Sequence, residues 1–453
     1  MRLFLAILLC KLARAALRVI GRGGTALPGT LALRVCPDIV SRLSKNIRTV
    51  MVTGTNGKTT TCRMIEKMLT DARIDCMANR SGSNLERGIA ADLCSNASFT
   101  GRPKKRTAVI ECDEAAFKRV CGEMQPAVVV VTNIFRDQLD RYGEVTHTLE
   151  SIRIGLERAQ NAIVCLDADD SLVASLAPDA PDRVRFYGID APLGEGSDIS
   201  DAPRCIVCGA EYEYDFHTYA HLGGFRCPKC GYSRTEPDVA VAGVDSLGAD
   251  GSVAEMRVDG EYYTAAVSLP AAYNLYNAAA AVAAATALGV GAEGAIKSLA
   301  HIESGFGRME RFELGKARVT MVLVKNPAGC DRAIDYLSAM PEGTTAVFCL
   351  NDGQADGTDV SWIWDAGFER LFAGGKEGPA GIIVSGTRAE DMRLRLKYAG
   401  ADENAVRIVR DVKELADAIA RCEGNVCVMP TYTAMLPLRA ELASRVGRKE
   451  FWK

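Results

Sequence analysis

The sequence predicts an α/β protein in which helices cover both faces of largely parallel sheets. Three observations predict this fold class. Short apolar runs alternate with helical segments between about residues 47 and 139, and the alternation returns after about residue 312. One run passes directly into a glycine-rich turn that opens a helix, and two closely spaced cysteine pairs interrupt the pattern near the middle of the chain. We therefore expect two α/β domains, with an insertion in the first.

The glycine-rich turn lies within residues 50–61, VMVTGTNGKTTT. Two glycines permit a tight turn after a buried strand, and an apolar-periodic helix follows. In such a turn the backbone N–H groups and the helix N-terminus face a bound phosphate chain. Lys58 would reach the β- and γ-phosphates, and the Thr59 hydroxyl would bind Mg²⁺. The spacing departs from the strict P-loop, but the context predicts an ATP-binding loop made of Gly54, Thr55, Asn56, Gly57, Lys58, Thr59 and Thr60.

Polar residues follow two other predicted strands. The run 107–111 ends at Glu111, and the run 127–131 is followed by Thr132 and Asn133. Ligands of parallel sheets bind beyond the carboxyl ends of the strands, so these groups should converge on the glycine-rich turn. Glu111, with two further acids just beyond it, is the predicted magnesium ligand. A solvated acidic turn is the alternative.

Composition limits the class of protein. At 453 residues the chain is long enough for two or three domains, and 48% hydrophobic and 25% charged residues are typical of globular proteins. The formal net charge of −3 argues against nucleic acid as the main partner. The sixteen cysteines are scattered, often inside apolar runs, which indicates reduced, buried thiols in the cytoplasm.

Residues 1–45 form a predicted basic amphipathic leader. The apolar run at residues 3–9 is too short to span a bilayer, which argues against secretion. Lys11, Arg14, Arg18 and Arg22 recur at three- and four-residue spacing, so they share one face of a helix. Such a helix can lie on the anionic inner face of a membrane, or it can pack on its own domain. Both interpretations remain open.

The cysteine pairs predict a zinc ribbon at residues 203–234. Each pair has the form Cys-x-x-Cys-Gly, and eighteen residues separate the pairs. Four thiolates give the closed tetrahedral shell that structural Zn²⁺ accepts. His217 and His221 lie between the pairs and are expected on the hairpin of the ribbon. The intervening residues 211–215, EYEYD, are acidic, so a structural role is favoured over nucleic-acid binding. The predicted zinc ligands are Cys205, Cys208, Cys227 and Cys230.

Motifs in chain order resemble the Mur ligase family. They are GTNGKTT at residues 54–60, the acidic strand end at Glu111, TN-x-x-x-DQ-x-D at 132–140, NLYN at 274–277, GRME at 307–310 and KNPAG at 325–329. The resemblance covers nearly all of the chain after the leader. It implies a central ATP-binding domain at residues 46–305 and a Rossmann-like domain at 306–453. It also implies a ligase that activates a carboxylate as an acyl phosphate, with Asn277 and Arg308 reaching the nucleotide.

Two departures from the family pattern indicate a variant. Mur ligases often carry a lysine, carbamylated in use, where this chain has Ile152 and Arg153, so the second Mg²⁺ loses its usual ligand. The family's Asp-Tyr-Ala-His-Asn-Pro sequence is VLVKNP here, at residues 322–327, without the carboxylate. One branch with a cysteine insertion is the ATP-using subunit of the enzyme that amidates D-glutamate in lipid II, and the resemblance extends to this branch.

The loop at residues 351–365, NDGQADGTDVSWIWD, holds four aspartates and two tryptophans beyond a predicted strand, which is typical of a functional loop. The chain shows no cysteine nucleophile with a paired base, so a partner must release ammonia. The resemblance implies a GatD-type glutaminase subunit, whose triad Asp359 would complete as a catalytic residue. Asp352 or Asp356 could do so instead, or all could be structural.

The sequence thus predicts the ATP- and Mg²⁺-dependent, zinc-containing subunit of a lipid II amidating enzyme. An amino-acid-adding or folylpolyglutamate-type ligase is the main alternative. A zinc-ribbon nucleic-acid-binding NTPase would need a basic face that the sequence lacks. A scaffold that binds ATP without turnover remains open.

Overall fold

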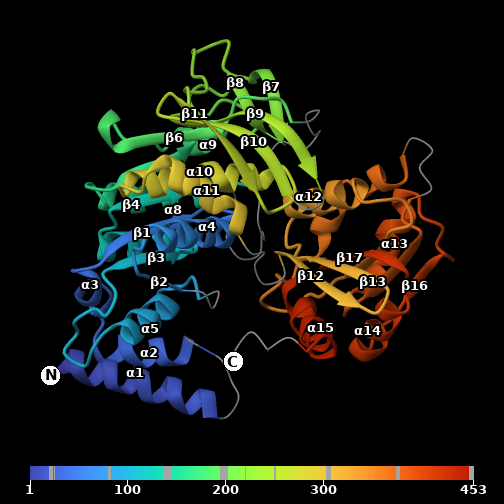
Figure 1. Cartoon of the computed structure of the whole chain (residues 1–453), viewed down its shortest axis with the longest axis horizontal. Coiled ribbons are helices and arrows are strands. Elements are labelled where there is room, and N and C mark those ends of the chain that lie inside the picture. The colour runs from blue at the N-terminus through green and yellow to red at the C-terminus, as the bar shows by residue number, and fades with distance from the viewer. Residues whose placement is uncertain are drawn as a thin grey trace.

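The computed structural model describes residues 1–19, 24, 26–79, 83–135, 145–193, 202–219, 221–248, 251–302, 308–373 and 378–447. The described chain forms two bodies, each built around a sheet (Figure 1). The larger body contains the amino-terminal two thirds of the chain, and the smaller body contains the orange and red elements.

The larger body contains a nine-stranded sheet in the order β11-β10-β9-β6-β5-β4-β1-β3-β2. The seven strands from β9 to β2 pair in parallel, whereas β10 and β11 add an antiparallel edge. Val50, Met51 and Val52 on β1, which lies between β4 and β3, are fully buried because helices cover both faces. The strands are β1 (Arg48–Thr53), β2 (Cys76–Ala78), β3 (Thr107–Glu111), β4 (Val128–Val131), β5 (Ile163–Asp167), β6 (Val184–Ile189), β9 (Val239–Gly248), β10 (Gly251–Val258) and β11 (Glu261–Val267).

Two hydrophobic clusters occupy the two faces of this sheet. One packs α4 (Lys58–Asp71), α10 (Tyr273–Ala287) and α11 (Ala292–Ser298) on one face. The alanines of α10 are almost fully buried, and their small side chains let this helix pack closely on the sheet. The other face holds α1 (Arg2–Val19), α2 (Ala26–Val35), α3 (Ile39–Ser44), α5 (Glu86–Asn96), α6 (Glu114–Met124) and α8 (Val145–Arg158). The short segments are α9 (Ser171–Ala174), η1 (Pro181–Arg183) and η2 (Leu299–His301).

The helices of the predicted leader pack on the larger body. Ala6, Ile7 and Cys10 of α1 are fully buried and belong to the same hydrophobic cluster as Met51 of β1. Figure 1 shows α1 and α2 below α5, at the end where the chain starts. None of the helices in the described part of the chain is long and apolar enough to cross a membrane.

The cysteine insertion forms a small antiparallel hairpin of β7 (Glu213–Tyr219) and β8 (Leu222–Arg226). The smaller body holds a six-stranded sheet in the order β12-β13-β17-β14-β15-β16, in which only β12 is antiparallel to its neighbour. Hydrophobic clusters fill both of its faces. Its elements are β12 (Arg308–Leu314), β13 (Ala317–Val322), α12 (Pro327–Ser338), β14 (Thr345–Cys349), η3 (Ser361–Trp364), η4 (Phe368–Leu371), β15 (Gly381–Ser385), α13 (Ala389–Ala399), β16 (Val406–Ile408), α14 (Val412–Ala420), β17 (Gly424–Pro430) and α15 (Tyr432–Arg445).

Candidate functional site

The glycine-rich turn joins the carboxyl end of β1 to the start of α4. Gly54 has a φ of +115° and Gly57 a φ of +86°, a region of backbone conformation that favours glycine. Space also requires glycine at both positions. A Cβ at residue 54 would lie 2.3 Å from Oγ1 of Thr132, and one at residue 57 would lie 2.2 Å from Oδ1 of Asn277. The turn is therefore packed tightly against groups that follow β4 and begin α10.

The residues after β4 hold the turn in shape. The N–H of Asn56 donates to Oδ1 of Asn133 at 2.9 Å, and the N–H of Thr55 donates to the backbone oxygen of Asn133 at 2.8 Å. The N–H of Phe135 donates to Oγ1 of Thr55 at 3.1 Å. These bonds bring together the strand ends that the sequence predicted to converge. The next residues of that motif, including Asp137, Gln138 and Asp140, lie outside the described residues.

Lys58 is buried at the first position of α4, only 6% exposed. Its Nζ donates to the backbone oxygens of Gly54 and Thr55 and forms an ion pair with Glu114 at 2.9 Å. The sequence grouped Glu114 with the magnesium-binding acids, but here it faces the loop lysine. Asp113, from the same group, accepts from the N–H of Ala115 at 3.1 Å and caps α6. Only Glu111 of the three acids is hydrogen-bonded to Thr59.

Thr59 and Glu111 supply the two predicted magnesium ligands from neighbouring elements. Oγ1 of Thr59 donates to Oε2 of Glu111 at 2.7 Å. Asn79 fixes the backbone of Glu111, accepting from its N–H at 2.8 Å and donating to its carbonyl at 2.7 Å. A hydroxyl and a carboxylate oxygen at a helix N-terminus are the ligands that a nucleotide-bound Mg²⁺ takes. The arrangement fits that ion.

Asn277 lies beside the turn at the beginning of α10, buried to 4% exposure. Its Oδ1 accepts from Thr61 at 3.4 Å, and its Nδ2 donates to Asn274 at 3.0 Å. Asn274 in turn donates to the carbonyl of Pro270. Arg308, the other residue predicted to reach the nucleotide, is the first residue of β12, and its side chain lies outside the described part of the structure.

The smaller body contacts the turn through α12. Asn326 caps this helix by accepting from the N–H of Gly329 at 2.7 Å, and its Nδ2 lies 3.5 Å from Oδ1 of Asn56. Six residues further along the chain, the guanidinium of Arg332 lies 5.5 Å from the ring centre of Phe135 and 5.0 Å from that of Tyr273. The glycine-rich turn therefore lies where the two bodies meet. The lysine that Mur ligases often carry in carbamylated form would fall on α8, and this helix carries no lysine. Arg153 on α8 instead forms an ion pair with Glu150 at 3.7 Å.

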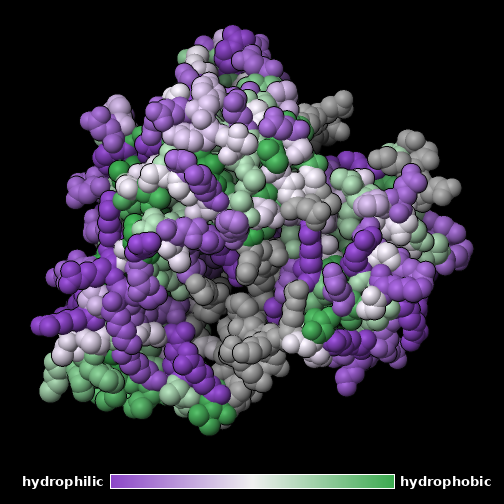
Figure 2. All heavy atoms as spheres, viewed as in Figure 1, coloured by the Kyte–Doolittle hydropathy of each residue, from purple (hydrophilic) through white to green (hydrophobic). Residues whose placement is uncertain are grey.

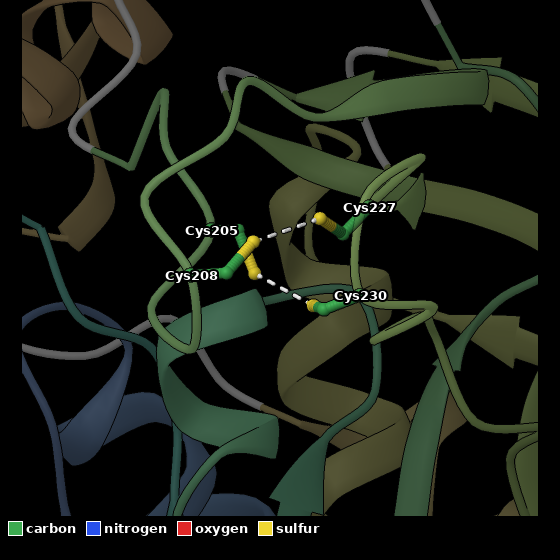
Figure 3. Close-up of side chains that lie close together, drawn as sticks. All are labelled: Cys205, Cys208, Cys227 and Cys230. Carbon is green, nitrogen blue, oxygen red and sulfur yellow. Dashed lines mark hydrogen bonds between the residues drawn. The ribbon is translucent and has the colours of Figure 1, made fainter.

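The four cysteines of the insertion form one cluster, with all four sulfurs within 4.8 Å of one another (Figure 3). Two pairs of sulfurs, from Cys205 and Cys230 and from Cys208 and Cys227, are 3.5 Å apart. Tetrahedral Zn²⁺, with Zn–S bonds of about 2.3 Å, needs sulfurs about 3.8 Å apart, whereas a disulfide needs about 2.05 Å. The donor set therefore fits a metal ion. The backbone N–H of Cys230 points at the sulfur of Cys227 and lowers its pKa to about 6.

The two histidines of the insertion lie elsewhere. His217 is on β7 and stacks on Tyr214 with ring centres 4.2 Å apart. His221 follows in the turn and is buried in the larger body, where its Nε2 lies 3.6 Å from Oδ1 of Asp170 and its ring packs on Phe135. Asp170 also accepts from the N–H of Ile134 at 2.9 Å. Through these contacts the insertion is connected to the residues that shape the glycine-rich turn.

Sequence reasoning missed this buried polar network at the end of β5. Asp169 is fully buried and accepts from Arg234 at 2.6 Å, from Tyr276 at 2.6 Å and from the N–H of Ile189 at 2.9 Å. Burial raises the pKa of both Asp167 and Asp169. The sequence did contain a signal for this network. Acids at 167, 169 and 170 follow the apolar run 163–166, just as an acid, Glu111, ends the run at 107–111.

The aspartates beyond β14 have different surroundings. Asp356 is buried and accepts from the N–H and hydroxyl of Thr433 and from the N–H of Gly353, so it fixes the loop to α15. Asp352 accepts from Thr387 at 2.9 Å and faces Arg388 at 3.5 Å. Asp359 is exposed, and its Oδ1 accepts from the N–H of Ser361 at 2.8 Å.

The carboxylate of Asp359 is exposed, and Ser361 stabilises its charged form. The hydroxyl and N–H of Ser361 hold the pKa of Asp359 below its usual value, so the group is charged at neutral pH. Trp364, five residues further along, is 47% exposed and contacts Tyr398, which is 70% exposed, with ring centres 5.6 Å apart. Exposed aromatic pairs of this kind are enriched at protein interfaces.

The sheet order, the glycine loop and the converging strand ends define a Mur-type ATP-dependent ligase. A family model for the Mur ligase middle domain matches residues 52–219, and one for the MurT ligase C-terminal region matches residues 323–435. The chain belongs to the MurT family. It is 35% identical to the lipid II isoglutaminyl synthase (glutamine-hydrolyzing) subunit MurT of Streptococcus pneumoniae (strain R6) over 95% of both chains. The corresponding subunit of Staphylococcus aureus (strain COL) is 33% identical over 98% of both.

Solved structures share the fold at lower identity. A pseudomurein peptide ligase type C from Methanothermus fervidus superimposes with a TM-score of 0.67 at 20% identity, covering 90% of this chain and 81% of that one. The folylpolyglutamate synthase of Mycobacterium tuberculosis superimposes with a TM-score of 0.62 at 14% identity, covering 91% and 95%. These likenesses concern the fold alone.

Proposed function

We propose that this protein is the ATP-dependent subunit of a glutamine-hydrolysing lipid II isoglutaminyl synthase. The α-carboxylate of D-glutamate in the peptide stem attacks the γ-phosphorus of ATP, ADP leaves, and an acyl phosphate forms. Ammonia then attacks the carbonyl carbon, phosphate leaves, and D-isoglutamine results. The observation that carries this proposal is the hydrogen bond between Thr59 and Glu111 at the start of α4. It lies beside the glycine-rich turn, which the smaller body contacts through Asn326.

The residues of the turn have separate roles in this reaction. Lys58 and the N–H groups of residues 54–60 hold the phosphates, with Asn277 and Arg308 contacting the nucleotide from α10 and β12. Thr59 and Glu111 hold Mg²⁺, which would supply positive charge to the phosphates. Lys58 is already desolvated, so its ammonium can stabilise the charge that develops as the phosphoryl group moves.

The ammonia comes from a GatD-type glutaminase subunit in a heterodimer. Asp359 approaches the partner's catalytic histidine, fixes its tautomer and stabilises its protonated form. The exposed Trp364–Tyr398 pair lies in the same region of the smaller body, which we propose to be Rossmann-like, and contributes to the interface. An amino-acid-adding ligase is disfavoured, because the family's carboxylate before Asn326 and its lysine on α8 are both replaced.

Co-expression with a glutaminase subunit tests the function. The purified complex is expected to convert lipid II to its amidated form with glutamine and ATP, measured by mass spectrometry, and to release ADP in equal amount. Free amino acids should not replace ammonia as the nucleophile. Absence of both a stable complex and amidation would refute the two-subunit proposal, and amino-acid addition would favour the alternative ligase.

We further propose that the cysteine cluster binds Zn²⁺ and holds the insertion on the larger body. The hydroxyl of Tyr232, two residues after the last cysteine, donates to the carbonyl of Ser171 at 2.7 Å, and Arg234 pairs with Asp169. Loss of the metal would release these contacts with α9 and β5, next to the residues that shape the nucleotide loop.

Cys227→Ser is expected to remove most of the bound zinc, measured by elemental analysis, and to lower the melting temperature, since structural Zn²⁺ contributes directly to folding. Cys422→Ser, a partly exposed cysteine outside the cluster, is the matched control and should retain both metal and stability. Full zinc content in the Cys227 variant would refute the site.

A further inference from the structure

We propose that α1, α2 and the loop 97–106 form a membrane-binding face that lies on the anionic inner surface of a bilayer. The choice of a bilayer over a second copy of this chain rests in part on the proposed function, whose substrate is a lipid. The surface itself is defined by the structure.

The outward face of α1 is apolar. At about 100° per residue, Phe4, Leu5, Leu8, Leu12 and Val19 lie within one third of the circumference of the helix. Phe4 is 50% exposed, Leu12 57% and Val19 87%. Figure 2 shows apolar side chains gathered along the lower edge of the molecule, where Figure 1 places α1. An ordinary surface helix buries one apolar side, and α1 does so with Ala6, Ile7 and Cys10, but it also leaves this second apolar side exposed.

Neighbouring segments extend the apolar face. Phe99, 48% exposed, packs on Phe4 with ring centres 5.9 Å apart, and Lys11 lies 4.7 Å from the centre of the Phe99 ring. On α2, which packs against α1, Leu27 is 55% exposed. Contiguous exposed apolar surface of this kind marks a site of protein or membrane contact in soluble proteins.

The structure divides three of the four cations that the sequence assigned to one basic face, and the fourth, Arg22, lies outside the described residues. Arg14 faces inward, with an ion pair to Asp92 at 2.9 Å and a hydrogen bond to Ser95 at 2.6 Å. Lys11 donates to the carbonyl of Ala97. These two residues attach α1 to α5 and to the residue that follows it, while Phe4, Leu12 and Val19 stay exposed. Arg2 and Arg18 remain exposed at the flanks of that side.

The segments that form the apolar face carry cations and no acids of their own, although Arg14 and Lys105 pair with Asp92 and Asp75 of neighbouring segments. Residues 1–37 contain six lysines and arginines and no aspartate or glutamate. The loop 97–106 adds four more cations and no acid, and three of them, Arg102, Lys104 and Arg106, are exposed. An apolar face with a basic rim complements an anionic lipid surface, whereas two copies of it would repel each other. Because no described helix can cross a bilayer, the contact is interfacial.

Vesicle binding of the full complex tests the proposal. Wild-type complex should co-sediment with vesicles of phosphatidylglycerol and phosphatidylcholine, less with pure phosphatidylcholine, and less at high salt. The double variant Phe4→Glu/Leu12→Glu is expected to reduce this binding at least tenfold. Leu247→Glu is the matched control, since Leu247 on β9 is 48% exposed and lies outside the face. A second variant, Arg18→Gln/Lys104→Gln, should lower binding only to anionic vesicles.

The outcomes separate this inference from the proposed function. Amidation of lipid II in anionic vesicles should fall in the double variant, while amidation in detergent micelles should not change. Equal vesicle binding by wild type, double variant and Leu247→Glu overturns the inference, and so does absence of binding by wild type. Conversion of a wild-type dimer to a monomer by the double variant would identify a second copy as the occupant and also overturn it. Lack of amidation in micelles by wild type would instead refute the function and leave vesicle binding intact.

Discussion

Asp359→Asn is expected to abolish glutamine-dependent amidation and to leave amidation with free ammonium intact. Asparagine keeps the size of the side chain but cannot stabilise a protonated imidazole, and such a change in a triad lowers kcat by about 10⁴-fold. The ATP site is unaffected because Asp359 lies on the smaller body, beyond β14, whereas the turn is at β1. The measurement compares amidation of lipid II with glutamine and with ammonium chloride in the same complex.

Neighbouring aspartates provide the controls. Asp365→Asn changes an exposed carboxylate of the same segment and should leave both activities unchanged. Asp356→Asn should lower the melting temperature, since Asp356 is buried and accepts from Gly353 and Thr433, and lost buried hydrogen bonds cost about 1–3 kcal/mol each. Its two activities should fall together. Loss of ammonium-dependent activity in a well-folded Asp359→Asn complex would contradict the triad role.

Local spacing explains which features could be predicted from sequence. The glycine-rich turn requires a positive φ at Gly54 and Gly57. The sequence predicts this, because it places glycines at both positions between a predicted strand and a predicted helix. The two cysteine pairs follow the same rule. Gly209 follows the first pair with a φ of +74°, and Gly231 follows the second with a φ of +80°. In both cases the residues that form the site are within a few positions of one another, or follow strand ends that a parallel sheet brings together.

Long-range partners explain what the sequence could not predict. Three- and four-residue spacing grouped Lys11 and Arg14 on one basic helix face, but it could not show that their partners come from residues 92–97, about eighty positions away. The contact of His221 with Asp170 likewise joins an inserted hairpin to a strand end fifty-one residues earlier. Pairing of this kind depends on how elements pack, which periodicity does not encode. The sequence shows the aspartates at the end of β5, but it does not show that they are buried.

Lys58→Met is expected to abolish amidation with both glutamine and ammonium, because activation of the carboxylate precedes the use of either nitrogen source. Removing one preorganised positive group from a desolvated site lowers kcat on the order of 10²- to 10³-fold. Lys67→Met, on the same helix, is the matched control: this partly exposed lysine pairs with Asp71 at 2.6 Å and should tolerate the change. The measurement is ADP release and product formation at saturating ATP.

Folding and catalysis must be separated in this variant, because Lys58 is also the cation that faces buried Glu114. Removing one member of a buried ion pair costs about 3–5 kcal/mol, so Lys58→Met should lower the melting temperature as well. The double variant Lys58→Met/Glu114→Gln removes the carboxylate charge and should recover most of that stability. If Lys58 acts on the phosphates, the double variant stays inactive although it is folded. Recovery of amidation together with stability would show that Lys58 serves the fold of the loop and that another group stabilises the transferred phosphoryl.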